Sequence, residues 1–318
     1  MGKYILKRLG MMVLTLFFIK TIGFCMMRAM PGGPYDDDPE LTPEQIEMME
    51  AKLNLDKPIH EQYFLFLKGI VLDGNWGVSV KLRPGLDALT VLKERIPHSM
   101  LLNIASLVIS VPLGILAGTL AAMFKNKWPD YIISFMVIIC ISVPSFVFAT
   151  GLQYFLSGKL AWFPAIYDVK GALGARLYSM VLPILALAFS PIATITRYLR
   201  GELIETLSSE YMLLARTKGL KKSQAVVRHA FRNSMVPLAN VIIPMFTNIM
   251  GGSLVVETIF AVPGIGGIIK ESINASDYSL ALGAMLFYSF ISVATIFIVD
   301  ISYGIIDPRI RLGGKKNG

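Results

Sequence analysis

Residue types that carry out enzymatic chemistry are few in this sequence, and they are not spaced for catalysis. No G-x-x-x-x-G-K-[ST] loop is present, so the chain does not carry the backbone cradle that binds nucleotide phosphates in the Walker manner. The three histidines His60, His98 and His229 are far apart in the sequence, and neither an H-E-x-x-H motif nor a G-x-S-x-G nucleophile turn occurs. The sequence therefore predicts no catalytic site, no metal site and no cofactor bound by this chain. The two cysteines, Cys25 and Cys140, lie in apolar runs, where we expect buried free thiols.

Polar side chains inside long apolar runs are the chemistry that the sequence does offer. The set comprises Ser142, Ser145, Gln153, Ser190, Thr194, Asn240, Thr247, Asn248, Ser253 and Asp300. Within a membrane span, such groups more often hydrogen-bond to a neighbouring helix than contact a transported solute. Asn240, Thr247, Asn248 and Gly251 recur at i, i+7, i+8 and i+11, which places them on one broad helical face. Together with Ser145, they are our candidates for lining a pathway. For Asp300, near the end of its run, an interfacial carboxylate is favoured over a proton-carrying site.

A basic, amphipathic segment between two apolar runs is the other prominent feature. Residues 197–237 carry eight Lys or Arg against three Glu, and apolar residues recur among them at helical spacing. Gly219 separates two such periodic stretches, and a glycine costs about 1 kcal/mol inside a helix. We therefore predict a helix, a break at Gly219, and a second helix. An ordinary basic loop beside a membrane is the alternative, but such a loop needs no apolar stripe, whereas a helix that docks on a partner does.

These residues must be positioned by membrane spans. Hydrophobic residues make up 54% of the 318 residues and charged residues 16%, with a mean hydropathy of +0.60, whereas soluble domains average about 25% charged. Six apolar runs are long enough to cross a bilayer, and the sequence therefore predicts an all-α polytopic membrane protein with six transmembrane helices. The predicted spans are residues 9–30, 98–124, 131–156, 178–197, 236–256 and 280–301.

The sequence between the first two spans differs in composition from the rest. Residues 31–97 are soluble in character, with a capping box at Thr42-Pro43-Glu44-Gln45 and a second helix expected from Pro58 to Asp73. We expect the two helices to dock on the spans, although a membrane-surface position or contact with an external partner is also open. The predicted organisation is a first span in residues 1–30, a helical extracytoplasmic insert in 31–97, and a core domain in 98–318 that contains the basic segment as a cytoplasmic loop in 200–235.

Charge distribution predicts the orientation. Lys and Arg are about two and a half times as frequent in one set of segments as in the other, which favours cytoplasmic N- and C-termini. The first set is 1–8, 125–130, 197–235 and 305–318, and the second is 31–97, 158–177 and 258–279. The net charge of +8 sits at span ends without a recognition motif, so nucleic acid is not an expected partner. Lys20 interrupts the first span and should face another helix, water or a membrane surface.

Within the basic segment, EYMLLARTKGLKKSQAVVRHAFRNSMVP resembles the EAA loop of ABC importer permeases of the oligopeptide/dipeptide/nickel branch. The matching positions are Ala215, Gly219, His229, Arg232, Asn233 and Pro237. Leu213 and Leu214 stand where the general signature has Glu-Ala. The resemblance implies that this loop couples the chain to an ATPase, through Glu210, Ala215, Arg216, Lys218, Gly219, Leu220 and His229.

Further stretches resemble the same branch in the same order along the chain. They are SVPSFVFATGLQYFLSGKLAWFPA, VVETIFAVPGIGGIIKESINASDY, the ending DPRIRLG, and an outer insert like that of the first, B-type permease subunit. The resemblance implies the type I importer fold and a peptide-transport complex in a bacterial cell membrane. Its partners would be a second permease, two cytoplasmic ATP-binding subunits that hold ATP and Mg²⁺, and an extracytoplasmic peptide-binding protein. A nickel or metal-chelate permease, an ion-coupled secondary transporter and a membrane-anchored assembly protein are the alternatives.

Overall fold

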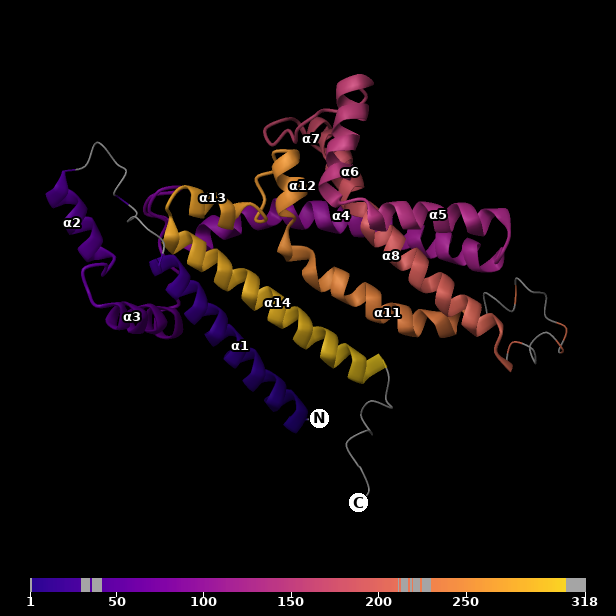
Figure 1. Ribbon diagram of the computed structural model, residues 1–318, viewed down its shortest axis with the longest axis horizontal. Coiled ribbons are helices and arrows are strands. Elements are labelled where there is room, and N and C mark those ends of the chain that lie inside the picture. Colours follow the sequence, from indigo (N-terminus) through magenta and orange to yellow (C-terminus); the bar gives the residue numbers. More distant parts are fainter. Residues whose placement is uncertain are drawn as a thin grey trace, which may run out of the picture. The chain divides into compact units, whose positions relative to one another are not determined.

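The computed structural model describes residues 2–29, 35, 42–210, 212, 217, 219, 224 and 230–306, and these are mostly helical (Figure 1). In chain order the elements are α1 (Gly2–Ala29), α2 (Pro43–Lys52), α3 (Ile59–Leu72), α4 (Ala88–Met123), α5 (Trp128–Ser142), α6 (Ser145–Leu152), the π-helix η1 (Gln153–Lys159), α7 (Leu173–Ser179), α8 (Val181–Leu207), α11 (Phe231–Thr247), the 3₁₀ helix η3 (Asn248–Gly251), α12 (Leu254–Ile259), α13 (Ile268–Asn274) and α14 (Tyr278–Ile306).

Five helices in the described part of the chain are long and apolar enough to cross a membrane. They cover Ile5–Ala29, Ala88–Met123, Val181–Leu207, Asn233–Gly251 and Tyr278–Ile301. A sixth span forms if α5 and the α6–η1 segment are counted together, although the chain bends by 104° between them. The bend falls at Ser142-Val143-Pro144-Ser145, where Pro144 cannot donate a backbone hydrogen bond to continue the helix. The predicted third span is therefore broken in its middle.

Residues group into two compact units, one formed by 1–97 and 264–294, the other by 98–263 and 295–318. In the first unit the expected capping box is confirmed: Thr42 accepts from the Gln45 amide, and the Gln45 side chain accepts from the Thr42 amide. Helix α3 begins after Pro58 and ends at Asp73, as predicted.

Helix α3 docks on α1, as expected for the insert. The hydroxyls of Thr21 and Tyr63 lie 2.5 Å apart, and the ring of Phe24 packs against those of Tyr63 and Phe66 at 5.3 Å between centroids. Lys20 faces this helix, with its ammonium 5.3 Å from the centre of the Phe66 ring. Cys25 on α1 is exposed, contrary to the expected buried thiol, and Cys140 is half-buried.

The second unit is built around α8, which packs against α5, α6, α7, α11 and α12. Helix α4 also approaches α8 closely: a Cβ added at Gly114 would lie 2.7 Å from Cβ of Ile195, and one at Gly118 would lie 2.9 Å from the Thr196 carbonyl oxygen. The GxxxG spacing therefore permits the close approach that it predicted.

Two helix boundaries in this unit differ from the prediction. Helix α8 continues past the predicted end of the span at Arg197 to Leu207, because Leu199 and Leu203 extend its buried stripe and this packing outweighs the cost of Gly201 inside the helix. Helix α11 begins at Phe231, not at Pro237. Ala230, Ser234 and Leu238 recur every four residues and are fully buried, so packing outweighs the unfavourable proline inside the helix.

Candidate functional site

The predicted coupling residues fall only partly within the described chain. Glu210 is exposed just beyond α8, and Gly219 is exposed with φ +88°, a left-handed conformation that favours glycine. A Cβ added at Gly219 would meet no atom within 4 Å, so the constraint there comes from the backbone and not from packing. The other predicted coupling residues, Ala215, Arg216, Lys218, Leu220 and His229, lie outside the described residues.

The base of this segment is a packed apolar cluster. Buried side chains from α4, from α8 and from both ends of the segment meet there: Ala122, Ile195, Leu199, Leu203, Met212, Ala230 and Leu238. A hydrogen bond of 3.1 Å between the hydroxyls of Thr206 and Ser234 links the end of α8 to the first turn of α11. The two helices that enter and leave the segment are therefore fastened together at its base.

A buried ion pair ties α5 to α8. The Arg200 guanidinium donates from Nε to Oδ1 of Asp130 at 2.5 Å and from Nη2 to Oδ2 at 2.8 Å. The Asp130 side chain is 2% exposed, and its Oδ2 also accepts from the backbone amide of Asn126 in the turn between α4 and α5. Bidentate pairs of this kind fix orientation as well as distance. Arg200 lies seven positions before Leu207, the last residue of α8, so this pair joins α5 to the helix that leads into the basic segment.

The proposed pathway residues are not all on one regular helix. Asn240 is half-buried on α11, and its Oδ1 is buried without a hydrogen-bond partner in the described part of the chain. Thr247 is the last residue of α11, whereas Asn248 and Gly251 begin and end the 3₁₀ helix η3. The spacing used to place all four on one face assumed continuous α-helix, and it applies only to Asn240 and Thr247. Ser145 is exposed and opens α6, directly after the 104° bend.

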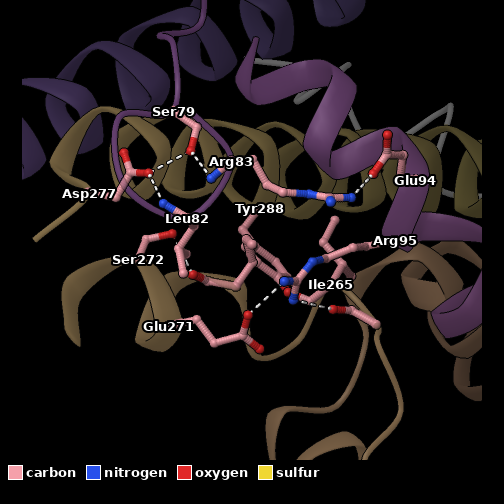
Figure 2. Close-up of polar contacts among 12 residues, drawn as sticks. Ser79, Leu82, Arg83, Glu94, Arg95, Ile265, Glu271, Ser272, Asp277 and Tyr288 are labelled. Atoms are coloured by element: carbon pink, nitrogen blue, oxygen red, sulfur yellow. Dashed lines mark hydrogen bonds and ion pairs between the residues drawn. The ribbon is translucent and has the colours of Figure 1, made fainter. Parts of the chain in front are cut away.

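In the first unit, a polar network surrounds Asp277, which lies immediately before α14 (Figure 2). Oδ2 of this fully buried carboxylate accepts from the Ser79 hydroxyl at 2.6 Å. It also accepts from three consecutive backbone amides, those of Val80, Lys81 and Leu82, at 3.0–3.1 Å. The loop between α3 and α4 is thus wrapped around one carboxylate.

Arg95 makes the second polar link in this unit (Figure 2). It donates from Nη2 to Oε2 of Glu271 on α13 at 2.7 Å and from Nη1 to the Gly264 carbonyl at 3.4 Å. The first turns of α4 are thereby joined to α13 and to the Gly-rich segment that precedes it. Among the described residues, no group of three or more His, Cys, Asp or Glu side chains could hold a metal ion.

Comparison with known protein families decides where the chain belongs. Residues 110–312 match the family described as binding-protein-dependent transport system inner membrane component, and residues 1–96 match the N-terminal region model of the same kind of transport system. The chain belongs to this family. The matched ranges include all the predicted coupling and pathway residues, together with the insert.

Curated relatives of this inner membrane component align along almost its full length. A dipeptide transport system permease protein of Lactococcus lactis is 41% identical over 312 residues, covering 98% of this chain and 100% of the relative. An oligopeptide transport system permease protein of Haemophilus influenzae is 35% identical over 311 residues, with 98% and 100% coverage.

A solved structure shows the same fold. The MetNI methionine ABC transporter in an inward-facing conformation superposes with a TM-score of 0.50 at 17% sequence identity, over 67% of this chain and 96% of the other. The predicted fold class, an all-α polytopic membrane protein of the type I ABC importer permease kind, is confirmed.

Several polar residues of this inner membrane component were missed by sequence reasoning. Glu257 on α12 is 3% exposed and accepts from the Ser99 hydroxyl at 2.6 Å and from the Ser253 amide at 3.1 Å. Asp277 and Asp130 were also missed. Ser253 and Asp277 each stand directly before an apolar helical run, which is the pattern of a helix N-cap and could have indicated both α12 and α14.

Proposed function

We propose that this chain is a transmembrane permease subunit of an ATP-driven ABC importer for peptides. It would form half of the translocation pathway and couple to a cytoplasmic ATPase through residues 210–231. Its membership of the binding-protein-dependent family favours this function over an ion-coupled secondary transporter. The peptide cargo is supported by the dipeptide and oligopeptide names of relatives that align along nearly the whole chain, which favours peptides over nickel or a metal chelate.

The observation that carries the coupling role is the continuity of α8 into the candidate segment. Helix α8 runs unbroken from Val181 to Leu207, and its inner end is packed through Leu203 against Met212 and fastened through Thr206 to Ser234. A displacement of the exposed part, which includes Glu210 and Gly219, would therefore move α8 and α11 together. Through Arg200 and Asp130 the same displacement would reach α5. Such movement of packed helices between two arrangements is the basis of alternating access.

The proposed complex contains a second, similar permease, two cytoplasmic ATP-binding subunits and an extracytoplasmic peptide-binding protein. ATP and Mg²⁺ would be bound by the ATP-binding subunits, and this chain would have no catalytic site or cofactor of its own. We propose cytoplasmic N- and C-termini in a bacterial cell membrane, as the distribution of Lys and Arg favours. The Asp277 and Arg95 networks would then shape the outer surface that receives the binding protein.

Replacement of Gly219 tests the coupling role. Because Gly219 has φ +88°, a β-branched residue is strained there. Gly219→Val should therefore change the geometry of the segment without touching the packed base. In proteoliposomes that hold the complete importer, we expect peptide uptake to be lost while ATP hydrolysis continues and expression is intact.

Gly219→Asn is the matched control, because asparagine tolerates left-handed backbone better than valine does, and it should retain more uptake. Wild-type uptake in Gly219→Val would contradict the coupling role.

A further inference from the structure

A cavity of about 160 Å³ lies in the first unit, among α1, α3, the turn between α2 and α3, the loop before α4, and the start of α14. Its lining includes three aromatic side chains, Phe24, Phe66 and Trp76, and four polar ones, Arg28, Asn54, Gln62 and Ser279. A water molecule occupies about 30 Å³ of liquid, so the cavity is large enough for a group of several heavy atoms.

Two polar atoms of this lining have no partner in the described part of the chain. Nε of Arg28 and Oε1 of Gln62 are buried and make no hydrogen bond there. The Gln62 side chain is held in place, since its Nε2 donates to the carbonyls of Leu55 at 3.1 Å and Lys57 at 2.7 Å, and the residue is 8% exposed. Buried donors and acceptors without partners are costly, and these two indicate a ligand with an anionic acceptor and a hydrogen-bond donor.

The walls of the cavity are preformed by close backbone contacts. A Cβ added at Gly283 would lie 2.7 Å from the Trp76 carbonyl oxygen, and one at Gly77 would lie 2.8 Å from that of Ser279. The Arg28 guanidinium lies 5.4 Å from the centre of the Phe24 ring, and this cation–π contact helps to hold the Arg28 side chain in place. The site is therefore built before any ligand arrives.

The cavity lies at the level of the lipid headgroups whichever way the chain is oriented. Arg28 is the next-to-last residue of the span Ile5–Ala29, so it is at a membrane surface. Phe64, Val71 and Leu72 on α3 are all more than 70% exposed. An amphipathic helix with such a face lies in the boundary between headgroups and acyl chains. Leu65, on the same helix, reaches from this face into the lining of the cavity.

We propose that this cavity binds the headgroup of a phospholipid. The phosphate would accept from Arg28, a headgroup ammonium or hydroxyl would donate to Oε1 of Gln62, and the aromatic walls would enclose the headgroup. The acyl chains would run along the exposed apolar side chains of α1, such as Ile22 and Met26. The proposal depends on α1 spanning the membrane and is independent of the peptide cargo.

To test this, the complete importer is reconstituted in phosphatidylethanolamine and phosphatidylglycerol and then transferred to detergent. Native mass spectrometry counts the phospholipids that remain bound. Arg28→Gln should weaken retention of one phospholipid per chain by about tenfold or more, because a charge-assisted hydrogen bond is lost. Arg28→Lys should retain an intermediate amount, since the charge remains without the planar donor fork.

A second variant distinguishes loss of lipid binding from a folding defect in Arg28→Gln. Asn54→Asp is isosteric at a residue with φ +56°, which Asp tolerates, and its charge in the cavity should repel a phosphate. Lys68→Gln is the matched control, because Lys68 is exposed on α3 and is not part of the lining; it should retain lipid like the wild type. A parallel sample receives glycerol phosphate in place of lipid.

Loss of the phospholipid from Arg28→Gln and Asn54→Asp but not from Lys68→Gln would support the proposal. Equal retention by the wild type and all four variants would overturn it. Binding of glycerol phosphate without retention of lipid would also overturn it, in favour of a site for a soluble anion.

Discussion

The contacts around Asp130 and those around Asp277 both bury a carboxylate, but they satisfy it in different ways. Asp130 pairs with a guanidinium from another helix, so the link is between two side chains and fixes how α5 lies against α8. Asp277 accepts from a serine hydroxyl and three successive backbone amides, so it fixes the path of a loop.

The difference bears on what each region can do. A pair of side chains can break and re-form as helices shift, whereas a loop whose amides converge on one oxygen has a single favourable conformation. The contacts around Asp130 thus allow connected helices to shift, whereas the network at Asp277 favours one shape of its loop. The predictions that follow test this contrast.

The largest loss is expected at the Asp277 network. Asp277→Ala removes one acceptor shared by four donors, and hydrogen bonds to a charged group contribute about 1.5–3 kcal/mol each, non-additively. We expect a loss of about 3–4 kcal/mol of stability, measured by thermal unfolding in detergent, and faster proteolysis within residues 78–83. Asp73→Ala, at the exposed end of α3, is the control. Protection of the loop equal to that of the wild type would contradict the assigned role.

A smaller loss of stability is expected at the ion pair between Asp130 and Arg200, together with a measurable coupling energy between the two residues. Arg200→Gln leaves Asp130 buried without its guanidinium and should cost about 2–3 kcal/mol. Asp130→Asn in the same background should cost little more, so the double-variant cycle should give a coupling energy of about 1–3 kcal/mol. Arg197→Gln, an exposed arginine on the same helix, is the control. Strict additivity would show that the two side chains act independently.

Replacement of glycine by alanine is expected to change stability in opposite directions at two positions of the second unit. Gly118→Ala places a methyl group 2.9 Å from the Thr196 carbonyl oxygen, so α4 and α8 must separate at a cost of about 1–3 kcal/mol. Gly201→Ala meets nothing within 4 Å on exposed α8 surface and should stabilise the chain by about 0.5–1 kcal/mol through helix propensity. Thermal unfolding of both variants gives the comparison. A stabilising Gly118→Ala would show that the helices are not in close contact there.

The smallest effect is expected at the ion pair between Arg83 and Glu94. Their side chains are 55% and 50% exposed, and pairs of this kind contribute about 0–1 kcal/mol despite the short distance of 2.6 Å. Arg83→Gln should therefore change stability by less than about 1 kcal/mol in thermal unfolding. A loss as large as that of Asp277→Ala would mean that this pair helps to hold the loop.

The sequence predicted the parts of this molecule that depend on local chemistry. The capping box at Thr42, the helix from Pro58 to Asp73 and the close packing at Gly114 and Gly118 each follow from a few neighbouring residues. Apolar run length and the EAA-like stretch likewise indicated the fold class and the family, because several separate stretches agreed.

What could not be predicted depends on contacts between distant residues. The apolar spacing after Arg197 predicted a helix there, but nothing nearby indicated that this helix is continuous with the preceding span. That continuity depends on the packing of Leu199 and Leu203 against Met212 and Leu238. The pairing of Asp130 with Arg200 joins residues 70 positions apart, and the Asp277 network joins residues about 200 positions apart. The polar spacing of residues 240–251 also did not reveal that the helix changes from α to 3₁₀ at Asn248.

The bend between α5 and α6 has a mechanical consequence. Each arm holds about 15 residues or fewer and is roughly 20 Å long, too short to cross the bilayer core alone. A push along the axis of α5 cannot pass straight around a 104° corner, so α5 and α6 can tilt separately, each against the part of α8 that it contacts. In the proposed coupling, unbroken α8, about 40 Å long, would be the rod along which a displacement at one membrane face reaches the other.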